Sequence, residues 1–313
     1  LFLHNAAIPV RKEFIDWTLP VDGTKSSLIW DKKVPLRQLP LIINPNSGWL
    51  NSTNQDPFKV TSKNDNLKRS DYSSTLGLQT RMTNRAYRAL ELFDSDKRIS
   101  VDDLMKIKFD NQYSKDSRAF HYIEPLFNHP FDDLKLQEAQ MLLKAWDLTT
   151  DHDNRSAALG VCSLSPEWLA EQEGKIPPDV IEVFTRCVKE ISSKYNRIDP
   201  LWSEVNFLTR GSKSLSVQGG PDTLRAIYGE TQKNGTLKAV AGDGLVVFVE
   251  WSKNGTLKSQ SIHQYGSATQ DIMSDHYDDQ IEIFAEERLK ETYFHTEALE
   301  LHTEKKYSVP HKK

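Results

Sequence analysis

The segment ending in Asn54 is the part of this 313-residue sequence whose residue types point most directly to chemistry. It reads Asn44-Pro45-Asn46-Ser47-Gly48-Trp49-Leu50-Asn51-Ser52-Thr53-Asn54 and follows a short apolar run. The amide of Asn54 is neutral and planar, and its NH2 group can donate hydrogen bonds to an oxygen that gains negative charge. The Pro and Gly residues before it favour a turn that holds the amide in place.

Other polar clusters do not complete a catalytic set. The sequence has no Gly-x-Ser-x-Gly, P-loop or dinucleotide motif. No phosphate-binding lysine follows the glycine-rich segment Gly219–Thr223, so a structural turn is favoured there. The segment His276–Gln280 allows a metal cluster or an acid/base site, but polar residues before a helix more often cap it and satisfy backbone groups. His121 and His152 are isolated, and each is interpreted as a surface or core histidine.

The composition excludes some classes of partner. With 38% hydrophobic and 27% charged residues, the chain suits one large domain or two modest ones. Its net charge of -4, with both signs mixed along the sequence, gives no basic field for nucleic acid or anionic lipid. No apolar run approaches the roughly 20 residues that span a bilayer, and the start lacks a signal-peptide pattern. We therefore expect neither nucleic acid nor a membrane as a partner.

The sequence contains two cysteines, Cys162 and Cys187, too few for a disulfide scaffold or a zinc site. They can pair with each other in an oxidising compartment. Two unpaired thiols are an equally good interpretation, so the sequence leaves both alternatives open.

The elements that must position these residues change in type along the chain. Residues 1–80 predict loops and a short strand at Leu39–Ile43, because Pro, Asp, Asn and Gly are frequent. Residues 81–200 are mainly helical, residues 201–296 predict hairpins and a final helix, and residues 297–313 form a polar, loosely held tail. This order indicates a layered α+β fold.

Helical spacing and end signals predict helices over Arg85–Phe93, Val101–Phe109, Ser117–Asn128, Leu134–Trp146, Pro178–Tyr195 and Asp279–Lys290. Ser100 and Asp103 resemble a capping box before the second of them, with Asp in place of the usual Glu. Pro166 and Pro178 are each placed at or near the first turn of a helix, where the missing N–H costs nothing.

Two near-identical Lys-Asn-Gly-Thr-Leu-Lys segments, at residues 233–238 and 253–258, predict consecutive hairpins. Asn-Gly favours a type I′ turn, in which both central residues have positive φ. Between the two turns, the apolar run Gly244–Trp251 predicts a strand buried on both faces.

The Asn44–Asn54 segment resembles the NP-x-SG-[WY]-[LI]-x-x-x-N element of the penicillin acylase family. Further segments resemble the same family in order, above all its acyl-homoserine-lactone and aculeacin acylases: His4–Arg11, Asp16-Trp17, Pro20–Gly23, Asp116–Ala119, Gly219–Leu224 and Ser274–Gln280. The resemblance runs from near residue 4 to about residue 290. It implies part of a four-layer αββα N-terminal-nucleophile hydrolase fold with an added helical region. The chain would be the C-terminal portion of the family's large chain.

The resemblance implies an amide hydrolase (acylase) acting on linear N-acyl amides through an acyl-enzyme. Candidate substrates are acyl-homoserine lactones, penicillin-type amides and lipopeptides. The family's nucleophile is a serine at the first position of the large chain, freed by precursor cleavage, and its own α-amino group is the base. Residue 1 here is Leu, so we expect the serine on another chain of the same processed precursor. This chain alone is expected to be inactive, and the mature protein to be periplasmic or secreted.

The resemblance also implies two catalytic residues. Asn54 corresponds to the asparagine whose amide stabilises the oxyanion, and Arg85 corresponds to an arginine at the start of a helix near the nucleophile's amino group. Arg81 and Arg88, one turn away on either side, compete for the second role. No cofactor is expected. The resemblance allows a structural calcium, but its ligands are not assigned, so no metal site is predicted.

Two other functions stay open. The chain can be a non-catalytic binding or scaffolding subunit of the same fold, because the nucleophile is expected elsewhere. Whether the partner polypeptide begins with Ser, Thr or Cys separates this alternative from an enzyme. An unrelated α+β binding module would require the ordered segments to match by coincidence.

Overall fold

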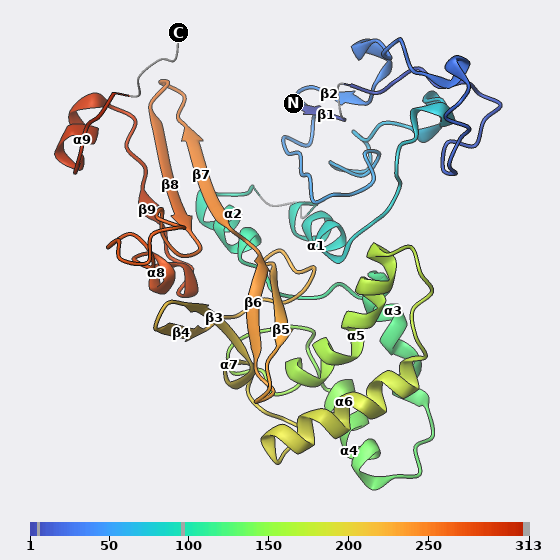
Figure 1. Cartoon of the computed structure of the whole chain (residues 1–313), viewed down its shortest axis with the longest axis vertical. Helices are drawn as coiled ribbons and strands as arrows, with labels where there is room; N and C mark the ends of the chain where they lie inside the picture. The colour runs from blue at the N-terminus through green and yellow to red at the C-terminus, as the bar shows by residue number, and fades with distance from the viewer. Residues whose placement is uncertain (5–6, 95–97, 309–313) are drawn as a thin grey trace. The chain divides into compact units, whose positions relative to one another are not determined.

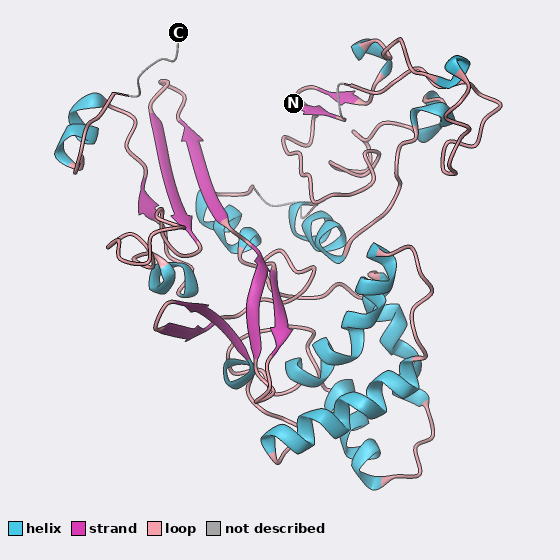
Figure 2. Ribbon diagram, viewed as in Figure 1, coloured by secondary structure: helices cyan, strands magenta, loops and turns pink. Residues whose placement is uncertain are grey.

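The computed structural model contains both helices and sheets, which confirms the predicted α+β class (Figure 2). The structure describes residues 1–4, 7–94 and 98–308. Asn5 and Ala6 of the first family-like segment, and residues 309–313 of the predicted tail, lie outside the described residues. Within the described ranges, no helix combines the length and apolar content needed to cross a membrane.

Two compact units make up the chain (Figure 1). Unit 1 consists of Leu1–Trp202 and Gly219–Ala226, and unit 2 consists of Ser203–Gln218 and Ile227–Lys313. Unit 1 therefore includes the glycine-rich segment that the sequence places far from its other parts.

The start of unit 1 consists of loops, 3-10 turns and a two-stranded sheet. β1 (Phe2–Leu3) pairs antiparallel with β2 (Leu41–Ile42), inside the predicted strand Leu39–Ile43. The described part of the same region also contains four 3-10 helices: η1 (Ser26–Leu28), η2 (Leu36–Gln38), η3 (Arg69–Asp71) and η4 (Ser74–Leu76). A small core gathers five buried side chains: Ile8, Leu39, Phe58, Leu76 and Leu78. Because Phe58 follows Asn54 closely, this core anchors the loop that carries the amide.

The rest of unit 1 is mainly helical: α1 (Asn84–Phe93), α2 (Val101–Lys108), α3 (Arg118–Ile123), η5 (Glu124–Asn128), α4 (Leu134–Lys144), α5 (Ala157–Gln172) and α6 (Val180–Tyr195), followed by the short α7 (Trp202–Val205). The capping box predicted for α2 is confirmed. The Asp103 N–H donates to Ser100 Oγ at 3.1 Å, and the Ser100 N–H donates to the Asp103 carboxylate at 3.0 Å. The shorter Asp side chain thus performs the role of the usual Glu.

Two helix predictions are wrong, and a proline is involved in each of them. A single helix over Ser117–Asn128 does not form, because α3 ends at Ile123 and the chain continues as a 3-10 helix containing Pro125. A proline has no N–H to bond the carbonyl four residues earlier. Pro166 does not begin a helix either, since it lies inside α5. The buried residues at the start of α5 pack well enough to outweigh the cost of an internal proline.

Cys162 on α5 and Cys187 on α6 form a disulfide, which decides between the two alternatives that the sequence left open. α5 also carries Gly160, whose missing side chain makes room for a neighbour. A Cβ at this position would lie 2.3 Å from the ring of Trp146. The glycine therefore permits a close approach that no other residue allows.

The sheets of unit 2 contain seven strands in its described residues: β3 (Asn206–Arg210), β4 (Lys213–Ser216), β5 (Ile227–Thr231), β6 (Leu237–Gly242), β7 (Leu245–Trp251), β8 (Leu257–His263) and β9 (Lys290–Glu291). A four-stranded sheet has the order β4-β3-β6-β5, and a three-stranded sheet has the order β7-β8-β9. Only β3 and β6 pair in parallel in the described part of these sheets.

The two predicted hairpins form, as β5–β6 and β7–β8. The type I′ turns are wrong, because Gly235 and Gly255 have positive φ (95° and 84°) while Asn234 and Asn254 do not. In each turn the glycine N–H donates back three residues, to Gln232 O in the first hairpin. This is the three-residue loop that combines a type I turn with a left-handed glycine.

The prediction that the Gly244–Trp251 strand is buried on both faces is also wrong. Val246 is 3% exposed, but Leu245 is 55% and Trp251 is 70% exposed. β7 is an edge strand that pairs with β8 alone in the described part of the chain. An apolar run shows that the residues of a strand are suited to burial, but it does not show which other element packs against them.

The end of unit 2 contains less helix than predicted. The expected helix Asp279–Lys290 is reduced to α8 (Ile281–Ala285), because the chain turns at Glu287, whose φ is 57°. The predicted polar tail includes a short helix, α9 (Thr296–Leu301), in which no residue is buried.

Candidate active site

The structure brings the two predicted site residues, Asn54 and Arg85, into contact within unit 1. Nη2 of Arg85 donates to Oδ1 of Asn54 at 3.3 Å. Nε of the same arginine donates to Oδ1 of Asp222 at 3.0 Å. An asparagine, an arginine and an aspartate from three distant segments thus form one connected group.

Asn54 lies at an exposed loop position with a backbone φ of 60°, in the left-handed region that asparagine tolerates better than most residues. Its loop is fixed on both sides by the segment that leads into α1. Oγ1 of Thr83 donates to Thr53 O at 3.2 Å, and the Asp56 N–H donates to Arg81 O at 2.8 Å. The start of α1 therefore determines where the Asn54 amide lies.

Asn51 and Gln55, to which the sequence assigned no role, brace this loop from inside. The Gln55 side chain accepts from the Thr53 N–H at 3.1 Å and donates to Asn51 Oδ1 at 2.9 Å. These bonds close the loop around Asn54 without using the Asn54 side chain.

The turn at residues 45–48, before Asn54, is held in place by the long polar loop that comes after Asn54 in the chain. The Ser47 N–H donates to the Asp65 carboxylate at 2.5 Å, and Oγ1 of Thr61 donates to Trp49 O at 2.7 Å. The Ser47 bond is the main cause that lowers the pKa of Asp65. Trp49 in turn stacks on Phe93 of α1, with ring centroids 5.3 Å apart. The polar loop is thus a structural support for the functional segment.

Three arginines lie in or just before α1, and only one of them contacts Asn54. Thr83 caps the helix by accepting from the Ala86 N–H at 3.1 Å, which places Arg85 in the first turn. Arg88 makes a two-pronged ion pair with Asp110, at 3.1 and 2.7 Å. Arg81 lines a cleft beside Asn54. Arg85 is therefore the member of this trio that contacts the Asn54 amide.

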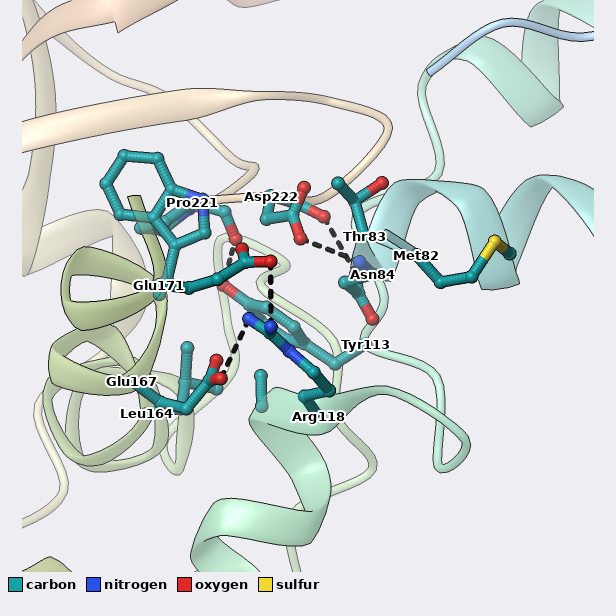
Figure 3. Close-up of a pocket in the computed structure, with 12 residues that line it drawn as sticks. Met82, Thr83, Asn84, Tyr113, Arg118, Leu164, Glu167, Glu171, Pro221 and Asp222 are labelled. Atoms are coloured by element: carbon teal, nitrogen blue, oxygen red, sulfur yellow. Dashed lines mark hydrogen bonds and ion pairs between the residues drawn. The ribbon is translucent and has the colours of Figure 1, made fainter. Parts of the chain in front are cut away.

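Asp222 is a candidate site residue that the sequence did not single out. It lies in the glycine-rich turn at residues 219–223 and is buried, with a φ of 58°. Its carboxylate accepts from the Asn84 N–H at 2.6 Å as well as from Arg85, and its carbonyl accepts from Asn84 Nδ2 at 2.9 Å (Figure 3). The turn interpretation is correct, but the turn also anchors the first residues of α1.

Burial raises the pKa of the Asp222 carboxyl, and its bonds to Arg85 and to the Asn84 N–H act in the opposite direction. The donors favour the ionised form, since a carboxylate can only accept. The only sequence signal for this residue was its place in the family-like segment Gly219–Leu224.

A second charged group lies next to Asp222. Arg118 donates to Glu167 at 2.8 Å and to Glu171 at 2.7 Å, and Arg81 lies 3.6 Å from the other Glu171 oxygen. Burial raises the pKa of Glu167, while Arg118 lowers it. Arg118, Glu167 and Glu171 line, together with Asp222, a small cavity (Figure 3). Its volume is about 10 Å³, room for a single water molecule.

A larger, open cleft of about 470 Å³ lies on unit 1 beside Asn54. Its lining combines the apolar residues Phe2, Leu3 and Val60 with polar side chains that include Gln79 and Arg81. The cleft is large enough to receive part of a small organic molecule.

The histidine segment at residues 276–280 belongs to unit 2, and among the residues that the structure describes it forms no cluster that could hold a metal ion. Nδ1 of His276 lies 2.9 Å from Asp279, and Nε2 lies 3.3 Å from Glu304. Gln280 accepts from the His263 N–H at 3.0 Å, which is the backbone-satisfying role that the sequence favoured, although it does not cap α8 with its side chain.

Comparison with known proteins identifies the family. Residues 1–300 match the model of the penicillin amidase family, and because this is most of the chain, the chain belongs to that family. The structure is similar to that of a thermostable penicillin G acylase from Alcaligenes faecalis, with a TM-score of 0.56 and 12% sequence identity. The similarity covers 99% of this chain and 65% of that one. At this identity the likeness concerns the fold alone, and it confirms the predicted α+β fold of the penicillin acylase kind.

Proposed function

We propose that this member of the penicillin amidase family is part of an amide hydrolase that cleaves linear N-acyl amides, with Asn54 stabilising the oxyanion. The observation that carries the proposal is the bond from Arg85 Nη2 to Asn54 Oδ1. A guanidinium can only donate, so the amide must turn its oxygen toward Arg85. The NH2 group of the same planar amide is then directed away from Arg85 and is available to donate to a substrate oxygen.

The nucleophile in this proposal is a serine at the start of another chain from the same precursor. Its hydroxyl attacks the amide carbonyl, and its α-amino group takes the proton, since an α-amino group titrates near pH ~8. The amine leaves, and water then releases the acid from the acyl-enzyme. During both steps the carbonyl oxygen becomes negative, and one fixed donor lowers such a barrier by roughly 3–4 kcal/mol.

Arg85 has two effects in this scheme. It fixes the orientation of the Asn54 amide, and its positive charge lies behind an amide that faces a developing negative charge. Asp222 holds Arg85 in this position through Nε and fixes the start of α1 through the Asn84 N–H. Both effects depend on groups set in place before the substrate binds.

The substrates we propose are N-acyl amides of the acyl-homoserine-lactone or penicillin type, bound together with the remaining chain of the precursor. We also propose a periplasmic or secreted location. The Cys162–Cys187 disulfide supports this location, because such bonds persist in oxidising compartments.

The test is Asn54→Ala in the mature enzyme, assayed with a series of chromogenic N-acyl amides. We expect kcat to fall by roughly 10²–10³-fold with KM little changed, because the donor acts mainly on the transition state. Asn54→Asp should be at least as slow, since it places a negative charge beside the oxyanion. Near-normal turnover by either variant contradicts the role of Asn54. A wild-type protein that hydrolyses none of the amides would instead favour a non-catalytic subunit.

A further inference from the structure

The side chain of Asn84, the first residue of α1, is buried and joins three segments of unit 1. Its Oδ1 accepts from the Ser114 N–H at 2.7 Å. Its Nδ2 donates to Asp222 O at 2.9 Å and to Gln112 O at 3.3 Å. The start of α1, the chain before α3 and the glycine-rich turn therefore meet at one amide group.

These contacts need a side chain that accepts and donates at the same position. An amide does both, whereas a carboxylate of the same shape can only accept. Asn84 is 3% exposed, so water does not replace a bond that the side chain loses. Asparagine therefore satisfies three backbone groups here, and aspartate would satisfy the Ser114 N–H alone.

Asn84 binds Asp222 at both its side chain and its backbone. The Asn84 N–H donates to the Asp222 carboxylate at 2.6 Å, and Asn84 Nδ2 donates to the Asp222 carbonyl (Figure 3). Asp222 has a φ of 58°, a left-handed conformation that is unfavourable for most residues with a side chain. Tyr113 supports the same turn by donating from its hydroxyl to Pro221 O at 2.7 Å. The direction of the carboxylate is therefore set by contacts with residues outside the turn.

The position of this carboxylate affects Asn54 through one arginine. Arg85 Nε donates to the other carboxylate oxygen of Asp222 at 3.0 Å, and Arg85 Nη2 donates to Asn54 Oδ1 at 3.3 Å. The guanidinium is planar and rigid, so a displaced carboxylate turns both donors together. A change at Asn84 that moves Asp222 therefore also moves the donor that orients the Asn54 amide.

We propose that Asn84 is a positioning residue for amide hydrolysis: its side chain fixes the turn that carries Asp222 and thereby sets the orientation of the Asn54 amide. This inference rests on the proposed function, since it assigns the oxyanion to Asn54. Asn84 acts through Asp222 and Arg85, so its loss changes the transition state more than substrate binding. The effect is then expected in kcat, with KM little changed.

The experiment measures kcat and KM for Asn84→Ala and Asn84→Asp in the mature enzyme, with one chromogenic N-acyl amide. Titration with a sulfonyl fluoride counts the active serines, so misfolded protein does not lower the measured kcat. We expect each variant to lose roughly tenfold in kcat. In an Arg85→Gln background the same substitutions should lower kcat by about twofold at most, because the path through Arg85 is already broken. If Asn84→Ala does not mature, the isosteric Asn84→Asp decides.

Asn154→Ala is the matched control. The Asn154 side chain also joins separate segments of unit 1, through bonds to Asp147, Thr149 and the Ala157 N–H. Its loss should lower the midpoint of chemical denaturation and leave kcat unchanged.

Three results overturn the inference: a normal kcat in Asn84→Asp, a tenfold loss that persists in the Arg85→Gln background, or an equal loss in the Asn154→Ala control. Asn54→Ala, assayed beside these variants, identifies a failure of the proposed function. Near-normal kcat in Asn54→Ala overturns both ideas, whereas a slow Asn54→Ala with a normal kcat in the Asn84 variants overturns the inference alone.

Discussion

Replacing Asp222 by Asn tests whether the site depends on a residue far from Asn54 in sequence. One carboxylate oxygen accepts from the Asn84 N–H at 2.6 Å and the other from Arg85 Nε at 3.0 Å. In Asp222→Asn, one of these positions becomes an NH2 group, which cannot accept. Whichever way the new amide turns, one donor on α1 then faces another donor.

The magnitude follows from the exposure of the two partners. A hydrogen bond to a charged group contributes about 1.5–3 kcal/mol, and breaking a fully buried pair costs roughly 3–5 kcal/mol. The Asp222 side chain is 11% exposed and that of Arg85 is 24%, so water partly solvates the charge left on Arg85. We expect Asp222→Asn to lower the free energy of unfolding by about 2–3 kcal/mol.

Activity should fall more than stability alone explains. Without its anchor, Arg85 no longer orients the Asn54 amide, and we expect kcat to fall by roughly 10–100-fold with KM little changed. Chemical denaturation measures the first effect, and steady-state kinetics well below the melting temperature measures the second. In a double-mutant cycle, Asp222→Asn should slow the Arg85→Gln variant much less than it slows the wild type, because the part of its effect that acts through Arg85 is already lost.

Asp199→Asn is the control for this prediction. Asp199 also pairs with an arginine, Arg197 at 2.7 Å, but both side chains are well exposed, at 32% and 43%. A surface pair of this kind contributes at most about 1 kcal/mol. If Asp222→Asn were as mild as Asp199→Asn and kept normal kcat, the anchoring role would be refuted.

Three further predictions concern packing, covalent linkage and pH. Gly160→Ala should lower the free energy of unfolding by about 1–2 kcal/mol, because the new Cβ would lie 2.3 Å from the ring of Trp146 and this overpacking outweighs the gain in helix propensity. A variant with a higher free energy of unfolding in chemical denaturation contradicts this. Replacing the Cys162–Cys187 disulfide by two serines should cost about 3–4 kcal/mol, given the 25-residue separation, and denaturation with and without reductant measures it. Carboxylates, first that of Asp279, raise the pKa of His276. The ion pair between the charged His276 and Glu304 of the tail is therefore fully formed below about pH 6.5. It is lost as the pH rises through the raised pKa of His276. Proteolysis near α9 should increase over that range in the wild type, and a His276→Gln variant that kept this pH dependence would refute the explanation.

Local signals predicted the parts of the fold that depend on neighbouring residues. The Ser100 capping box and the helices around Arg85 and Val183 rest on spacing of three or four residues, and all of them form. The same kind of reasoning was wrong at Pro166 and at the β7 run, for one reason. Packing by distant residues decides whether a helix can contain a proline and whether an apolar strand is covered.

The candidate site shows the same division. Asn54 and Arg85 were proposed from motifs, each in its own segment, but their contact joins residues 31 positions apart. Asp222 lies 137 positions from Arg85. No local pattern marks a buried aspartate in a glycine-rich turn as the partner of a helix start, so this residue required the structure.

The three arginines in and just before α1 show how identical side chains come to make different contacts. Arg81, Arg85 and Arg88 share one segment, and the sequence offered little reason to assign them different roles. What separates them is the set of acidic side chains that each contacts. Asp110 binds Nε and Nη2 of Arg88, and Glu91 binds its Nη1. Asp222 binds only Nε of Arg85. Arg85 thus keeps a donor for Asn54, whereas Arg81 shares the Glu171 carboxylate with Arg118. The positions of acidic residues in distant segments, rather than those of the arginines along the chain, therefore determine which of the three cations contacts Asn54.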